Sequence, residues 1–186
     1  MNLNRALALL FATFTFFISL LALGSERISA DTRLIPKAIM QDIQLKGARA
    51  VVSQLYEHPQ TWRLILADIA TGDQSWLEVA VALHPGSDAG SSEMLTLAVG
   101  AALENNPANV FQTALKAFQL KSICSGPDVD DPKYGSYELS MKAINQRIGK
   151  VNSIKDKSSA AISKACVQHL EESKNGITQF YQVKSK

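Results

Sequence analysis

The residues of this chain that could do chemistry are few. Its three histidines stand at positions 58, 84 and 169, and none of them has the His-x-x-x-His or His-Glu-x-x-His spacing of a zinc site. His58 and His84 each precede a proline at an expected helix C-terminus, where an imidazole can interact favourably with the helix dipole. Neither a nucleophile elbow nor a phosphate-binding glycine-rich loop occurs. We therefore expect no catalytic residue, no metal site and no cofactor.

Acidic residues gather at one expected turn between two helices. Asp68, Asp73 and Glu78 lie around it, together with Trp76. Two facing carboxylates could work as acid and base in an envelope hydrolase, although helix capping by itself explains Asp73 and Glu78. The same four residues could instead form a binding surface, and we predict this role for them. Trp76 is expected to pack against Trp62 on the adjacent helix.

The chain has two cysteines, Cys124 and Cys166. An isolated pair usually forms a disulfide in an oxidising compartment. Closing a loop of this length should stabilise the protein by about 4 kcal/mol in the chain-entropy model. The sequence therefore predicts one disulfide, with two buried free thiols as the alternative.

The N-terminus has the layout of a secretory signal. Arg5 precedes an uncharged apolar stretch over residues 6–24, and small residues at its end suit a signal peptidase. We expect residues 1–24 to be a signal peptide, with a second possible cleavage after residue 30. The stretch also approaches the ~20 residues that span a bilayer. The expected location is thus periplasmic or secreted, and the alternative is an N-terminal anchor in the inner membrane facing the periplasm.

Charge is unevenly distributed along the chain, whose net charge is +2. Residues 31–132 carry 7 basic and 12 acidic side chains, a net of −5, whereas residues 133–186 carry 10 and 4, a net of +6. We expect the two parts to attract each other and pack together. The alternative is that the basic part meets an anionic partner, a membrane surface or an acidic protein. The near-neutral total argues against a nucleic-acid partner.

After the expected signal peptide, apolar residues recur every three or four positions, which predicts helices throughout the rest of the chain. The expected helices cover residues 36–57, 60–70, 75–83, 92–104, 107–124 and 137–173. Asp73 or Ser75 should cap the third of them, and the polar segment 155–159 could divide the last into two. Gly176 should end the final helix, leaving residues 177–186 as a flexible tail. Residues 31–176 then form a single helical domain.

Two helix–turn–helix units repeat at a spacing of 33 residues, with turns at Gly72-Asp73 and Asn105-Asn106. Over residues 59–122 the arrangement resembles HEAT-like α-helical hairpin repeats. This resemblance implies stacked hairpins with a binding face. The expected fold is all-α, with stacked antiparallel helical hairpins in a bundle or short HEAT-like array. A long C-terminal helix or helix pair closes it, and one disulfide crosses it.

Export, stacked hairpins and the lack of a catalytic motif together favour a non-catalytic protein. We expect it to bind or inhibit another exported protein in the periplasm, as an immunity protein against a toxin would. An envelope hydrolase and a carrier of small apolar ligands are the alternatives. Membrane contact is expected only through a retained N-terminal segment.

Overall fold

The computed structural model describes residues 35–184, and within that range all regular structure is helical. The α-helices are α2 (Pro36–Lys46), α3 (Ala48–Tyr56), α4 (Pro59–Ile69), α5 (Gln74–Leu83), α6 (Ala89–Ala102), α7 (Pro107–Thr113), α8 (Leu120–Ile123), α9 (Tyr137–Asn152) and α10 (Ala160–Lys184). Short 3₁₀ turns are η2 (His84–Gly86), η3 (Ala114–Lys116), η4 (Pro132–Tyr134) and η5 (Lys157–Ser159). The all-α prediction is confirmed. The expected signal peptide, its two cleavage points and the alternative anchor lie outside the described residues.

Helix starts follow local chemistry. Prolines occupy the first turn of α2, α4 and α7, where the missing N–H costs nothing. Asp73 caps α5, because its Oδ1 accepts hydrogen bonds from the backbone N–H groups of Ser75 at 2.9 Å and Trp76 at 3.3 Å. Of the two predicted caps, Asp73 is therefore right and Ser75 wrong. A reciprocal capping box lies instead at Asp88 and Ser91, so α6 begins at residue 89, before the predicted 92.

The single helix predicted over residues 36–57 is two helices. Gly47 separates them with a φ of +82°, a left-handed conformation that glycine adopts without strain. The break lets α3 pack against η2, and the two backbones approach closely there. A Cβ added at Gly86 would lie 2.3 Å from the carbonyl carbon of Ala48 and from the nitrogen of Arg49. Only glycine therefore fits at position 86.

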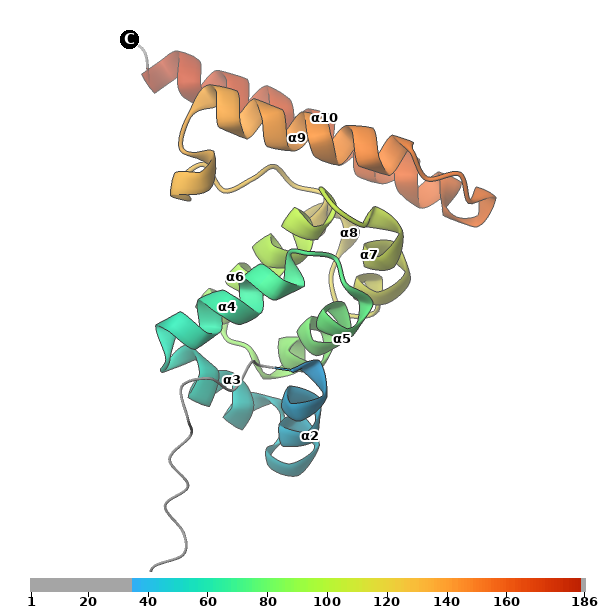
Figure 1. The fold of residues 1–186 in the computed structure, drawn as a ribbon. Helices are drawn as coiled ribbons and strands as arrows, with labels where there is room; N and C mark the ends of the chain where they lie inside the picture. The colour runs from blue at the N-terminus through green and yellow to red at the C-terminus, as the bar shows by residue number, and fades with distance from the viewer. Residues whose placement is uncertain (1–34, 185–186) are drawn as a thin grey trace, which may run out of the picture. The chain divides into compact units, whose positions relative to one another are not determined.

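The hairpins α4–α5 and α6–α7 stack, with α4 against α6 and α5 against α7 (Figure 1). Their turns meet directly. The side-chain amide of Asn105 donates to the carbonyl of Ala70 at 2.9 Å, and that of Asn109 donates to Gly72 at 3.0 Å. Gly72 has a φ of +75°, and a Cβ there would lie 2.9 Å from Cβ of Asn106. The 33-residue spacing thus corresponds to one turn lying on the next.

The core of this stack is apolar and dense. Its fully buried side chains include Ile65, Ile69, Leu77, Leu83, Leu95, Val99, Leu103 and Val110. The helix predicted over residues 107–124 is interrupted, because α7 ends at Thr113 and η3 precedes the short α8. The rings of His84, at the end of α5, and Phe118, between η3 and α8, are in contact, with centroids 4.4 Å apart.

The helices α9 and α10 form a long pair at the end of the chain (Figure 1). The sequence left open whether one helix or two cover residues 137–173, and the structure has two, since α9 ends at Asn152 and α10 begins at Ala160. The predicted stop at Gly176 is wrong, and helix extends over most of the expected tail, as far as Lys184. Ile177 is 6% exposed and packs close to Gly126, so tertiary burial outweighs the helix-breaking tendency of one glycine. Between residues 35 and 184, no helix is long and apolar enough to cross a membrane.

Candidate functional site

The four residues predicted as a binding surface lie where α4 turns into α5. The carboxylate of Asp73 is taken up by capping, and the exposed Glu78 accepts a hydrogen bond from Nε2 of Gln74 at 3.2 Å. Asp68 is half-buried, and its backbone carbonyl accepts from the Thr71 hydroxyl at 2.6 Å. Paired-carboxylate hydrolysis needs surroundings that distinguish the two acids. Asp73 and Glu78 are both exposed to solvent, so their surroundings do not distinguish them, and the hydrolase hypothesis has little support.

A groove of about 330 Å³ lies between the start of α2 and the exposed face of α5. Its lining residues are Ile35, Pro36, Lys37, Met40, Ser75 and Glu78. Apolar side chains supply one wall, and Lys37 and Glu78 supply charges of opposite sign. Such a groove can take an apolar side chain of a partner while pairing with polar groups at its edge. Of these lining residues, only Glu78 belongs to the binding surface predicted from the sequence.

The two tryptophans have different surroundings. Trp62 is fully buried, its ring lies edge-on to Tyr56 with a centroid distance of 6.0 Å, and its Nε1 donates to the sulfur of Met94 at 3.4 Å. Tyr56, rather than Trp76, is therefore its aromatic partner, contrary to the prediction. Trp76 is half-buried against the core, on the helix that forms one side of the groove.

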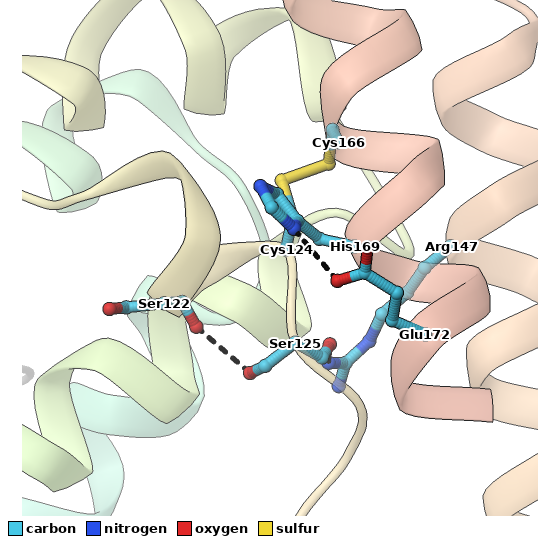
Figure 2. Close-up of a disulfide and its surroundings, with 7 residues drawn as sticks. All are labelled: Ser122, Cys124, Ser125, Arg147, Cys166, His169 and Glu172. Carbon is cyan, nitrogen blue, oxygen red and sulfur yellow. Dashed lines mark hydrogen bonds and ion pairs between the residues drawn. A yellow bond between two sulfur atoms is a disulfide. The ribbon is translucent and has the colours of Figure 1, made fainter. Parts of the chain in front are cut away.

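A second polar site, which the sequence analysis missed, is the buried ion pair between Glu104 and Arg147. Nε and Nη2 of Arg147 donate to Oε1 of Glu104 at 3.0 and 2.9 Å, and Nη1 donates to the carbonyl of Ser125 at 3.0 Å. Figure 2 shows the guanidinium of Arg147 reaching toward Ser125. Arg147 is 2% exposed and Glu104 8%. The pair joins the end of α6 to α9 across 43 positions of sequence.

Neighbouring side chains complete this cluster. The hydroxyl of Tyr134 donates to Oε1 of Glu104 at 3.2 Å, and Nζ of Lys133 donates to that hydroxyl at 2.6 Å. Partial burial by itself lowers the pKa of Lys133, but the bond to Tyr134 and the nearby Glu104 carboxylate outweigh it and raise that pKa. The Ser140 hydroxyl donates to the backbone carbonyl of Tyr134 at 2.6 Å. These hydrogen bonds connect η4, α9 and the end of α6, so the role of the cluster is structural.

The predicted disulfide is confirmed. Cys124 and Cys166 are bonded, their Cα atoms are 5.2 Å apart, and both residues are fully buried (Figure 2). The bond ties the end of α8 to α10. Beside it, Nδ1 of His169 lies 3.3 Å from Oε2 of Glu172, and this hydrogen bond lowers the pKa of the Glu172 carboxyl.

The other histidines are positioned as helix-end residues. His84 is the C-cap of α5 and His58 the N-cap of α4. Among residues 35–184, no group of three or more His, Cys, Asp or Glu side chains could hold a metal ion. The likeness to HEAT-like repeats rests on the stacking of the two hairpins. No protein-family model, curated protein sequence or solved structure matches this chain.

Proposed function

We propose that this chain is a non-catalytic binding protein that acts through the groove between α2 and α5, and that its partner is another exported protein. The groove is the observation that carries the proposal. It offers apolar contact from Ile35, Pro36 and Met40 beside the opposite charges of Lys37 and Glu78. Apolar area bordered by polar groups is the usual make-up of a protein interface.

The buried polar groups support binding rather than catalysis. Arg147 and Tyr134 both donate hydrogen bonds to the Glu104 carboxylate, and these bonds link α9 and η4 to the end of α6, away from the groove. Among buried side-chain polar atoms of the described residues, only Oγ of Ser163 lacks a hydrogen-bond partner. An active site usually keeps several ionisable groups poised and accessible in one cleft.

Export is part of the proposal. Disulfides persist in oxidising compartments and are rare in the cytosol. The Cys124–Cys166 bond therefore agrees with export, for which the apolar segment at residues 6–24 is the sequence signal. Periplasm or secretion is favoured, with an N-terminal anchor facing the periplasm as the alternative. Within that compartment, inhibition of a toxin or hydrolase delivered there is one form that the binding could take.

The test compares three exported forms of the full chain as affinity baits in periplasmic extract. Lys37→Glu combined with Glu78→Lys reverses both groove charges at unchanged net charge. Arg63→Glu combined with Glu93→Lys is the matched control on the exposed faces of α4 and α6. We expect one protein to be recovered in stoichiometric amount by the wild type and the control, and to be lost with the groove variant.

Thermal unfolding of all three baits checks that each is folded. We expect similar melting temperatures, because exposed charges contribute little to stability. Recovery of the same partner by all three would place the binding surface elsewhere. Recovery of no stoichiometric partner would oppose the binding proposal. Soluble fragments released from cell wall by the pure protein, and lost in Asp68→Ala, would replace binding by the hydrolase reading.

A further inference from the structure

Four lysines lie at the end of the α9–α10 pair where the two helices are joined. Lys150 is in the last turn of α9, Lys155 and Lys157 are in the connection, and Lys164 is in the second turn of α10. All four are exposed. At 1.5 Å per residue, Lys164 is only about 6 Å along α10 from its start, so the four share one end of the helix pair (Figure 1). We call them the lysine tip.

The positive charge of the lysine tip is not neutralised locally. From residue 139 to residue 170 the sequence contains a single acid, Asp156. Its carboxylate accepts hydrogen bonds from the N–H of Ser158 at 3.1 Å and from the hydroxyls of Ser158 and Ser159. Within residues 35–184, no carboxylate forms an ion pair with any of the four lysines. The tip therefore presents four lysine cations, and the one nearby carboxylate in the sequence, that of Asp156, is hydrogen-bonded to Ser158 and Ser159.

The composition of the tip indicates the kind of partner. Residues 138–179 contain no Phe, Trp or Tyr, and Arg147 is buried against Glu104. Energetically dominant residues of protein interfaces are mainly Trp, Tyr and Arg, so this end lacks the anchors of a specific protein contact. Ile154 packs against the core, so apolar insertion is not available to it either. Flexible exposed lysines instead suit a fluid layer of negative charge.

From this placement we propose that the lysine tip binds anionic phospholipid headgroups at a membrane surface. This surface lies on the α9–α10 pair, whereas the groove lies between α2 and α5, so a protein partner and a membrane could be held by different elements. The attraction is electrostatic. It therefore requires acidic lipid and weakens as salt rises.

The test is co-sedimentation of the full chain with vesicles of phosphatidylglycerol and phosphatidylcholine in equal parts, and with vesicles of phosphatidylcholine alone. Binding to the uncharged vesicles measures how far the apolar N-terminal segment by itself brings the chain to the membrane. This contribution is the same in all variants, because none of them changes that segment. The tip variant is Lys155→Gln, Lys157→Gln and Lys164→Gln combined. The matched control, Lys46→Gln, Arg49→Gln and Arg63→Gln combined, removes the same charge from α2, α3 and α4.

We expect the wild type and the control to bind anionic vesicles, and binding to fall between ~50 and ~300 mM salt. At roughly fivefold per lysine, the tip variant should bind about 100-fold more weakly. Equal losses in both variants, or equal binding to charged and uncharged vesicles, would overturn the proposal. Binding to soluble polyglutamate but not to anionic vesicles would assign the tip to an acidic protein and overturn it as well.

Discussion

The hairpin stack α4–α7 and the helix pair α9–α10 are held in different ways. In the stack, backbones approach closely at Gly72, and asparagine amides pair one turn with the next. The pair is instead joined to the other helices through side chains. These joints include the Cys124–Cys166 bond, the Arg147–Glu104 ion pair and the packing of Ile177 near Gly126.

This difference determines what can separate each region. A steric contact between backbones has no chemical trigger, whereas a disulfide yields to reductant and a buried ion pair fails when one partner is removed. The pair also has its own interface, since Ile144 and Val151 of α9 and Leu170 of α10 are fully buried. We therefore expect α9 and α10 to loosen from the stack together, before the stack itself opens.

Removing the charge of Arg147 should have the largest effect. Arg147→Met leaves the Glu104 carboxylate buried without its partner, which costs about 3–5 kcal/mol of unfolding free energy. Adding Glu104→Gln should restore much of that loss. Lys150→Met, an exposed site on the same helix, is the control and should change stability by less than about 0.5 kcal/mol. Urea unfolding measures all four, and a loss below about 1 kcal/mol for Arg147→Met would contradict a buried joint.

Breaking the disulfide should lower the unfolding free energy by about 4 kcal/mol, because it closes a segment with a sequence separation of 42. Wild type with and without reductant is compared with the double variant Cys124→Ala, Cys166→Ala, on which reductant should have no effect. Hydrogen exchange should then accelerate first in α9 and α10. Uniform acceleration across the stack and the pair would refute the separation of the two regions.

Gly86→Ala tests the close approach of backbones beside the stack. The new Cβ would lie 2.3 Å from two backbone atoms of α3, so the helix must move, at a cost of about 3 kcal/mol. Gly149→Ala in α9 is the control, because nothing lies within 4 Å of its Cβ position. It should stabilise by about 0.5–1 kcal/mol, since alanine is the better helix former. Thermal melts showing the same sign for both variants would disprove the steric account.

Asn109→Ala should have a smaller effect on the stack. It leaves the carbonyl of Gly72 without the side-chain donor now 3.0 Å away, at a cost of about 1 kcal/mol. The exposed Asn145→Ala in α9 is the control. Chemical denaturation measures both. Equal stability of the two variants would mean that turn-on-turn pairing contributes nothing.

Acid should weaken the start of α6 by a modest amount. The side-chain and backbone hydrogen bonds from Ser91 lower the pKa of Asp88 below its usual range. A carboxyl with a lowered folded-state pKa stabilises the protein above its unfolded pKa, about 3.9, and this contribution disappears as pH falls through the folded value. Asp88→Asn should therefore lose less thermal stability than the wild type between about pH 5 and pH 2. Glu93→Gln in the same helix is the control, and identical pH profiles for Asp88→Asn and the wild type would count against this assignment.

Local signals in the sequence were enough for the helical class and several boundaries. Pro36 and Pro107 begin helices, Asp73 caps one, and the polar segment 155–159 divides the last two. These signals work because a first turn or a cap depends on only a few consecutive residues. The disulfide was predictable for another reason, since two cysteines permit only one internal pairing.

Only the tertiary structure decided the contacts between distant segments. Glu104 and Arg147 are 43 positions apart and stand as ordinary charged residues in the sequence, yet packing makes them a buried pair. The α2 wall of the groove faces Glu78 for the same reason, and the burial of Ile177 extends α10 beyond Gly176. A helical pattern shows which side of a helix is apolar, but it does not specify which other helix covers that side.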